Sequence, residues 1–242
     1  MPPRVASEPM GIAKNFIPCL IDSFQAHGLG GSILTLGRQD IETGESPESF
    51  FRGLGFSKVE SLDISKSEGA DIAFDLNQQS PPENLRCRCD VLFDGGTLEH
   101  VFHVPNALAN CSDMIRPDGW FVHLGPLDNW VDHGFYQFSP TIWFDWFMAN
   151  NWEVTESTMI KMGKEWSFSV LPPGKLGTAG EMDKAPYMHY LVARKLSHAT
   201  TNAIPMQAYY STTHRPPLRL REFSPFVVAN GKKKSRSWFT RS

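Results

Sequence analysis

The sequence predicts an α/β fold with a mostly parallel sheet and helices on both faces. Two observations carry this prediction. Strand-like apolar runs alternate with amphipathic helical segments from residue 10 to residue 150, which is typical of a parallel sheet covered on both sides. Two late strand-like runs, 152–159 and 187–195, are separated by a Gly/Pro-rich loop instead of a helix. We therefore expect an antiparallel addition at one edge of the sheet.

The first part of the chain predicts two helices and three strands. Apolar residues recur every fourth position from Ile12 to Phe24, and glycines at 28, 30 and 31 end that helix. Ser46 and Pro47 form an N-cap and a first helical position for the second helix. The expected elements are a helix over 10–27, a strand over 32–37, a helix from 47 to 54, and strands over 58–64 and 71–76.

The second part predicts a longer helix, an aromatic helix and four more strands. Arg116 to Gly119 form a turn signal that should end the first of these helices. Ser139-Pro140 opens the second helix, which is rich in Trp and Phe. The expected elements are a strand over 89–94, a helix from 105 to 115, a strand over 120–124, a helix over 141–150, and strands over 152–159 and 187–195.

The net charge of −3 hides a division of the chain. Residues 1–195 hold 15 Lys/Arg and 25 Asp/Glu, a net charge of −10, whereas residues 196–242 hold 8 Lys/Arg and one acid, a net charge of +7. We therefore predict an N-terminal helical segment over 1–29, a main domain over 30–195, and a basic, partly disordered tail over 196–242. Part of that tail is expected to dock on the body through Tyr209 and Tyr210.

Composition excludes several classes of protein. No apolar run approaches the roughly 20 residues of a membrane helix, and the first residues show no signal-peptide pattern. Four scattered cysteines indicate a reducing cytoplasm, and the one-residue gap of Cys87-Arg88-Cys89 does not suit zinc, so we predict no metal. The acidic body argues against a nucleic-acid partner, and the oligomeric state stays open.

Candidate functional residues lie where the strands end. Gly37, Asp63, Asp75 and Asp94 each follow an expected strand, and parallel sheets bind ligands at the carboxyl ends of their strands. A glycine allows close approach of the backbone to a ligand, and a carboxylate accepts hydrogen bonds from ribose hydroxyls. The pattern therefore predicts a nucleoside-type ligand.

Four segments carry a family resemblance: Phe74 to Asn77, the run from Cys89 to Val101 that contains Leu98-Glu99-His100, the turn from Ile115 to Trp120, and the stretch from His133 to Pro140. They resemble class I S-adenosylmethionine-dependent methyltransferases. The resemblance is strongest to the bacterial branch with a Leu-Glu-His signature after strand four, and it covers about residues 30–195. It implies a Rossmann-like, mostly parallel seven-stranded sheet with one antiparallel strand near the edge.

The resemblance also implies a cofactor, S-adenosylmethionine, and roles for particular residues. The first turn would hold the methionine part, the acid after strand two the ribose, and the acid after strand three the adenine, while the turn after strand four faces the methyl group. The implied cofactor-binding residues are Leu36, Gly37, Arg38, Asp63, Ile64, Asp75, Leu76, Asn77, Asp94, Gly95, Gly96 and Thr97.

The catalytic candidates are His100 and His133, because imidazole titrates near neutral pH. The candidates for contact with a small-molecule acceptor are Glu99, His133, Tyr136 and Gln137. We expect a methyltransferase acting on a small-molecule or glycan-type acceptor. A methyltransferase-fold binding or scaffold protein without turnover is the alternative, and RNA modification guided by the tail is a third, weaker one.

The first turn departs from the pattern of the resembling family, which has an acid and three alternating glycines there. Here the turn is Thr35-Leu-Gly37-Arg38-Gln39-Asp-Ile41, so only the first glycine is present. Arg38 and Gln39 place long side chains where the cofactor would pass. Either the loop is reshaped around the cofactor, with Arg38 on its carboxylate, or binding is weakened or lost.

Overall fold

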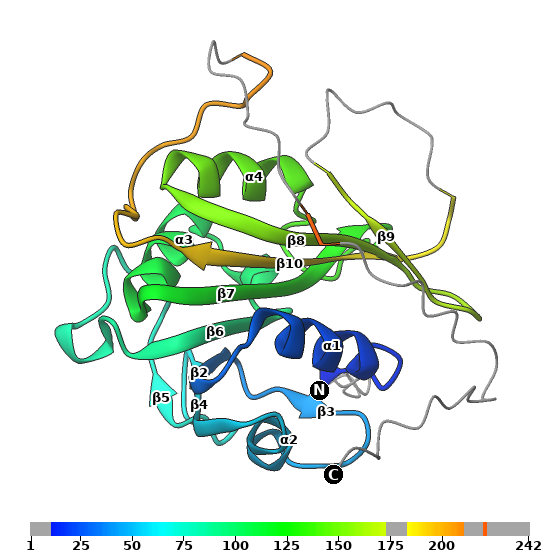
Figure 1. The fold of residues 1–242 in the computed structure, drawn as a ribbon, viewed down its shortest axis with the longest axis horizontal. Helices are drawn as coiled ribbons and strands as arrows, with labels where there is room; N and C mark the ends of the chain where they lie inside the picture. Colours follow the sequence, from blue (N-terminus) through cyan, green and yellow to red (C-terminus); the bar gives the residue numbers. More distant parts are fainter. Residues whose placement is uncertain (1–10, 173–182, 211–219, 222–242) are drawn as a thin grey trace, which may run out of the picture.

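An eight-stranded mixed sheet organises the chain, seen in a computed structural model that describes residues 11–172, 183–210 and 220–221. The strand order is β5-β4-β2-β6-β7-β10-β8-β9 (Figure 1). The strands are β2 (Gly31–Leu36), β4 (Phe56–Asp63), β5 (Ile72–Ala73), β6 (Cys89–Gly95), β7 (Ile115–Asp128), β8 (Trp152–Lys161), β9 (Ser167–Val170) and β10 (Tyr187–Lys195). The predicted α/β class, with helices on both faces, is confirmed.

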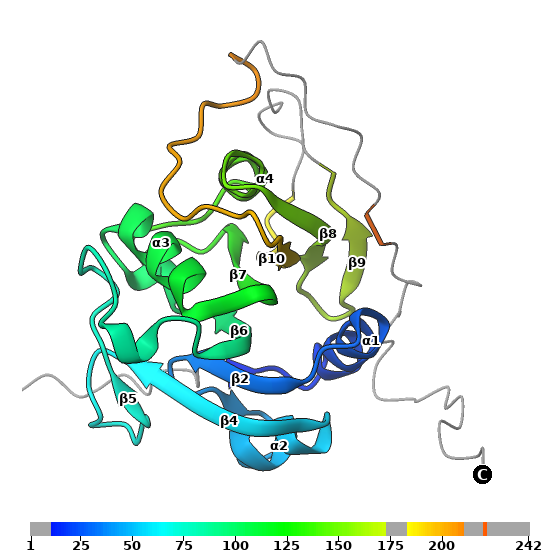
Figure 2. The ribbon, with the colours of Figure 1, turned by 60° about the vertical axis from the view of Figure 1, so that its left-hand side comes forward.

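Four α-helices cover the sheet, two on each face (Figure 2). They are α1 (Ile17–His27), α2 (Pro47–Gly53), α3 (Val104–Met114) and α4 (Pro140–Ala149), with short helical turns η1 (Glu83–Leu85) and η2 (Leu98–His100). Alternating side chains of one strand serve both faces: Val91 and Phe93 of β6 pack with α1 and α2, whereas Leu92 packs with α3 and α4. Such two-sided burial requires strands that are apolar throughout.

The parallel half of the sheet contains a point where strand order reverses. β2 pairs in parallel with β4 on one side and with β6 on the other. The chain builds outward from β2 through β4 to β5, then returns to the other side of β2 with β6 and β7. Ligands of such sheets bind outside the carboxyl ends of the strands at this point. The turns after β2 and β6 are therefore the first place to look for a site.

The sheet has one strand more than the seven predicted. β10 runs antiparallel to both β7 and β8, as expected for the late pair, but β9 adds a further antiparallel strand beside β8. The alternating sequence Ser-Phe-Ser-Val of β9 is short and half exposed. The sequence did not predict this strand, because four alternating residues give little periodic signal.

The predicted turn at 116–119 lies inside β7 instead of before it. Cys89 pairs with Ile115 and Val91 with Trp120, so residues 116–119 form a bulge in the parallel ladder. Asp118 has φ +63° there, a backbone conformation that Asp tolerates better than most residues. The prediction of a turn at 116–119 is confirmed, but the prediction that this turn separates a helix from a strand is wrong.

Helix ends follow the predicted caps, with two differences in element length. Gly28 ends α1 in a left-handed conformation, and the Ser46 side chain accepts a hydrogen bond from the Ser49 amide at the start of α2. α1 begins later than predicted because β1 (Gly11–Ile12) pairs with β3 (Asp40–Ile41). The third predicted strand shrinks to the two residues of β5, so Asp75 lies in the following loop.

Part of the C-terminal segment packs on the body. Asn150, at the end of α4, bonds through its side chain to Thr200 and Ala203. Arg221 forms ion pairs with Asp22 of α1 and Glu156 of β8. The rest of the predicted tail, 211–219 and 222–242, lies outside the described residues. No helix among the described residues is long and apolar enough to cross a membrane.

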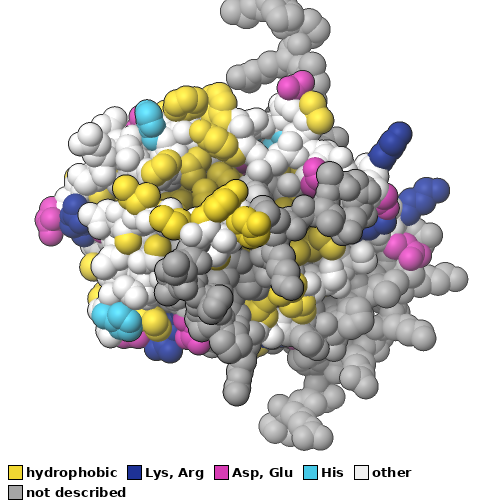
Figure 3. All heavy atoms as spheres, turned by 90° about the horizontal axis from the view of Figure 1, so that it is seen from above, with side chains coloured by type: hydrophobic (Ala, Val, Ile, Leu, Met, Phe, Trp, Pro, Cys, Tyr) yellow, Lys and Arg dark blue, Asp and Glu magenta, His cyan; other side chains and the backbone are white. Residues whose placement is uncertain are grey.

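Exposed hydrophobic side chains mark the segment that passes above α4. In Figure 3, which looks down on this side of the molecule, hydrophobic side chains gather across the face. The exposed members on the segment are Ile204, Met206, Tyr209 and Tyr210.

Candidate functional site

The turns after β2, β4 and β6 meet around Gly37, and we refer to this junction as the crevice. This residue has φ +69°, and a Cβ atom placed on it would lie 3.2 Å from Oγ1 of Thr97 and 4.0 Å from Oδ2 of Asp63. Thr97 Oγ1 in turn donates to the Leu36 carbonyl at 2.9 Å, which joins the two turns. Residues predicted at three strand ends therefore meet at one point, where a side chain in place of the glycine would crowd Thr97.

Gln39, one of the residues by which the first turn departs from the glycine-rich pattern, lies in the same crevice. Its side chain is almost fully buried, and Nε2 donates to the Leu36 carbonyl at 2.6 Å. Oε1 faces Gly95 so closely that a Cβ there would overlap it. This buried oxygen has no hydrogen-bond partner among the described residues. Only the fold reveals that the side chain turns inward, since glutamine is ordinarily a surface residue.

Asp63 presents one carboxylate oxygen to the crevice. Its Oδ1 accepts a hydrogen bond from the Ile64 amide at 2.6 Å, while Oδ2 is the atom that faces Gly37. Ile64 is 69% exposed beside it, which is unusual for so apolar a residue. Arg38 is exposed and directs Nη1 toward the Glu68 carbonyl, 3.4 Å away. Its long side chain thus leaves the crevice instead of filling it.

The loop after β5 is fixed by hydrogen bonds to α3. Asp75 accepts from both the backbone and the side-chain nitrogen of Asn77, which lowers the pKa of its carboxyl group. Asn77 Oδ1 accepts from the His103 amide at 2.9 Å, and Asn110 Nδ2 donates to the Leu76 carbonyl at 3.1 Å. The loop is also tied to β4, because the Phe74 amide bonds to the Asp63 carbonyl. The predicted residues 75–77 thus have a defined geometry at this strand end.

The Asp94 side chain holds the turn after β6 through hydrogen bonds to its backbone. It is fully buried and accepts hydrogen bonds from the amides of Thr97 and Leu98, and its second oxygen lies 2.6 Å from Nδ1 of His123. Both oxygens are therefore engaged within the protein. This geometry gives the Asp94 side chain a positioning role, so the surface that the turn offers to a ligand comes from Gly95, Gly96 and Thr97.

Glu99, His100 and His133 lie together beside this turn. Oε1 of Glu99 is 3.6 Å from Nε2 of His133 and 4.0 Å from Nε2 of His100. Burial, and then the negative charge of Asp94, raise the pKa of Glu99 to about 8. Burial and the neighbouring His133 lower the pKa of His100. A neutral His100 imidazole at pH 7 is able to accept a proton.

The loop after β7 places His133 over Glu99. The amides of Phe135 and Tyr136 both donate to the Glu99 carbonyl, at 2.8 and 3.2 Å. Tyr136 Oη donates to the Phe102 carbonyl, and Gln137 Oε1 accepts from the Trp130 amide. The polar atoms of Tyr136 and Gln137 thus close this loop, His133 is directed at Glu99, and Phe135 is exposed.

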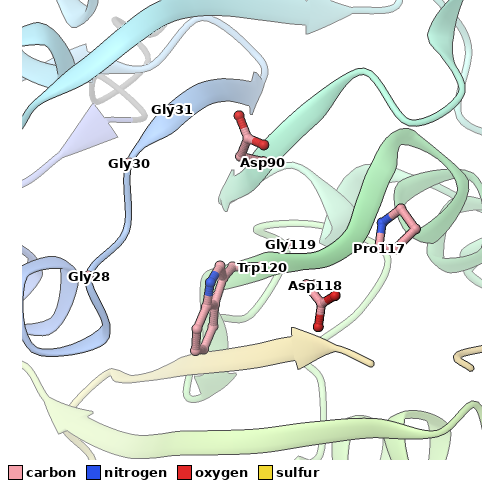
Figure 4. Close-up of a pocket in the computed structure, with 8 residues that line it drawn as sticks. All are labelled: Gly28, Gly30, Gly31, Asp90, Pro117, Asp118, Gly119 and Trp120. Carbon is pink, nitrogen blue, oxygen red and sulfur yellow. The ribbon is translucent and has the colours of Figure 1, made fainter. Parts of the chain in front are cut away.

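A shallow hollow of about 500 Å³ lies at the opposite edge of the sheet (Figure 4). Its lining comes from the starts of β2, β6 and β7, including Gly31, Asp90 and Trp120. Asp90 there is held by Ser32 and Arg116. None of the predicted site residues lines this hollow, and its position at the amino ends of the strands separates it from the crevice.

Comparison with known proteins supports the fold. No protein-family model matches the chain, and no curated protein matches it. A putative methyltransferase from Bacillus halodurans C-125 superposes with a TM-score of 0.51, at 12% identity, over 73% of this chain and 98% of that one. The 1,6-didemethyltoxoflavin-N1-methyltransferase of Burkholderia thailandensis, solved with S-adenosylhomocysteine, gives a TM-score of 0.46 at 18% identity over 76% and 79%. The likeness to the Bacillus halodurans structure shows that the chain has a Rossmann-like fold of the kind found in that protein.

Proposed function

We propose that the chain is an S-adenosylmethionine-dependent methyltransferase that acts on a small-molecule or glycan-type acceptor. The observation that carries the proposal is the convergence of Gly37, Asp63 and Thr97 at the point where the strand order of the sheet reverses. The fold it shares with a putative methyltransferase adds support. The cofactor supplies an electrophilic methyl group, so the protein mainly has to bind and orient.

The residues of the crevice suit the chemical groups of this cofactor. The Oδ2 atom of Asp63, which faces Gly37, is an acceptor for ribose hydroxyls, and Gly37 carries no Cβ that would crowd Thr97 and keep a ligand from the backbone. The unpartnered Oε1 of Gln39 is an acceptor for an α-ammonium group. Arg38, exposed at the rim, is a partner for a carboxylate.

The Glu99, His100 and His133 cluster supports the acceptor side of the proposal. Glu99 and His100 follow the turn of Gly95 to Thr97 by two to three residues, and Phe102 and Phe135, two residues beyond His100 and His133, are exposed rings that meet edge to face at 5.7 Å. Aromatic rings offer a flat surface to a ring-shaped acceptor. His100 is then in place to take a proton from an attacking hydroxyl or amine.

One observation favours the alternative, a protein that binds without turnover. The Gln39 side chain fills the space above Gly95, so a cofactor would have to sit beside it or displace it. Binding and turnover therefore need separate measurements.

Isothermal titration calorimetry with S-adenosylmethionine and S-adenosylhomocysteine tests the proposal. We expect saturable binding by the full chain, and Asp63→Asn should weaken it at least tenfold, because a hydrogen bond to a charged group contributes roughly 1.5–3 kcal/mol. Asn keeps an acceptor for the Ile64 amide, so the fold should survive. Absence of binding at millimolar cofactor would refute the proposal.

Asp118→Asn is the matched control for that experiment. It makes the same chemical change at the opposite edge of the sheet, at a position with φ +63° that Asn also tolerates. The control should bind the cofactor as the wild type does. If cofactor binds but no methyl transfer occurs over a broad panel of hydroxyl and amine acceptors, the binding-protein alternative gains support.

A further inference from the structure

Three side chains with metal-ligating atoms converge beside the cofactor crevice. One ligand atom each from Glu99, His100 and His133 lies within 4.8 Å of the other two. The shortest separation joins Glu99 Oε1 to His133 Nε2 at 3.6 Å, and the imidazole rings of the two histidines are 5.2 Å apart. The cluster is assembled across the fold, since Glu99 and His100 follow β6 and His133 follows β7.

Glu99 is a buried carboxylic group without a partner. Its side chain is 1% exposed, and neither Oε1 nor Oε2 has a hydrogen bond among the described residues. Buried polar groups in proteins are nearly always satisfied, so such a group needs an explanation. A cation between Glu99 and the two histidines would satisfy it. No Lys or Arg of the described chain forms an ion pair with Glu99.

The backbone around Glu99 is shaped to hold His133 in place. A Cβ atom on Gly134 would lie 2.9 Å from the Glu99 carbonyl oxygen and 3.1 Å from its Cγ, so a larger residue would push the loop away. On the other side, a Cβ on Gly96 would lie 3.2 Å from Glu99 Oε1. The two glycines let both loops close on the carboxyl group, and the side-chain geometry is therefore set by the fold.

We propose that Glu99, His100 and His133 bind one divalent transition-metal ion of the Zn²⁺ type. Two imidazoles and one carboxylate form the ligand set of many sites for such ions, with positions left open for water or substrate. A tetrahedral ion with ligands about 2.1 Å away separates them by roughly 3.4 Å. The observed 3.6 and 4.0 Å need only a small closing movement, which the partly exposed His100 and His133 rings can make.

The open side of the site faces the aromatic rim. Trp130 stacks at a tilt on His133 with ring centroids 5.0 Å apart, and Phe102 and Phe135 are more than half exposed nearby. An ion here would offer a coordination position to a hydroxyl or carboxylate oxygen of an acceptor, and it would replace His100 as the group that helps a hydroxyl lose its proton, because a metal-bound imidazole nitrogen accepts none. That role rests on the proposed methyltransferase function, whereas binding of the ion does not.

The test is metal binding by the full chain, without cofactor. After treatment with a chelator and dialysis, titration with Zn²⁺ should show one saturable site per chain, and Co²⁺ should give the visible absorption bands of a protein-bound ion. His133→Ala and Glu99→Gln should each weaken Zn²⁺ binding at least tenfold and remove the Co²⁺ bands. Mg²⁺, which prefers oxygen ligands, should not compete at equal concentration.

His198→Ala is the matched control, because His198 is an exposed histidine outside the cluster. It should leave Zn²⁺ affinity and the Co²⁺ spectrum unchanged. Thermal unfolding verifies that each variant is folded, and His100→Ala, at a half-exposed ring, replaces any variant that is not. Absence of saturable Zn²⁺ binding, or binding that survives all three cluster substitutions, would overturn the proposal. Because S-adenosylmethionine binding is measured separately, loss of one proposal leaves the other standing.

Discussion

Replacing Gly37 by alanine separates backbone strain from loss of the ligand site. Gly37 and Gly44 both have a left-handed backbone, with φ +69° and φ +82°. The space around the two differs. A Cβ on Gly37 would come within 3.2 Å of Thr97 Oγ1, whereas nothing lies within 4 Å of a Cβ on Gly44. Gly44→Ala is therefore the control that carries strain alone.

The expected magnitudes follow from this difference. An alanine in a left-handed conformation costs about 1–2 kcal/mol, so each variant should lose that much stability. In Gly37→Ala the Thr97 hydroxyl must also move, which endangers its hydrogen bond to the Leu36 carbonyl, a contribution of about 1 kcal/mol. We expect losses of about 2–3 kcal/mol for Gly37→Ala and about 1–2 kcal/mol for Gly44→Ala.

Urea unfolding measures the stabilities, and calorimetry measures the affinity for S-adenosylmethionine. Gly37→Ala should reduce affinity at least tenfold because its methyl group fills the crevice between Thr97 and Asp63. Gly44→Ala should bind as the wild type does. Equal affinities of the two variants would refute the assignment of Gly37 to the cofactor site, even if their stabilities differ as expected.

Three further substitutions probe the interior by urea unfolding. Burial, and then His123, hold the pKa of His189 well below its usual 6.5. Only the unfolded chain then binds this proton, so stability should fall below pH 6.5 by up to about 1.4 kcal/mol per pH unit. His189→Gln should make that fall shallower; an unchanged slope between pH 5 and 7 would contradict it. Asp94→Asn should lower the free energy of unfolding by about 3 kcal/mol, because His123 and two amides lose a charged acceptor. A loss below 1 kcal/mol would contradict the positioning role of Asp94. Arg221→Met should lower the free energy of unfolding by about 2 kcal/mol, because the buried Glu156 loses this ion-pair partner. An unchanged free energy of unfolding would mean that the C-terminal contact is not stabilising.

Most of the fold was predictable because its strands and caps are local signals. Apolar runs marked β2 and β6, and Ser46-Pro47 and Gly28 marked helix ends at the right residues. The failures have a common cause, which is pairing with a distant partner. β9 exists because β8 offers it an edge, and residues 116–119 bulge within β7 because Ile115 already pairs with Cys89. Neither partner is visible in the local pattern.

The residues of the candidate site were predictable from the sequence, but the contacts that each side chain makes were not. The strand-end positions drew attention to Gly37, Asp63 and Thr97, and these meet as expected from a parallel sheet. The inward turn of Gln39 and the full burial of Asp94 depend on packing, which a single sequence does not report.

The segment from Asp94 to His100 links the two proposed sites physically. Its first residue holds the turn through the Thr97 and Leu98 amides, and its last two residues supply two of the three proposed metal ligands. Gly96 lies between them against Glu99 Oε1. A change in this segment therefore disturbs both sites, and loss of methyl transfer in such a variant would not identify its cause. Substitutions at Asp63 and His133 each touch one site only, and their separate effects on cofactor and metal binding distinguish the two.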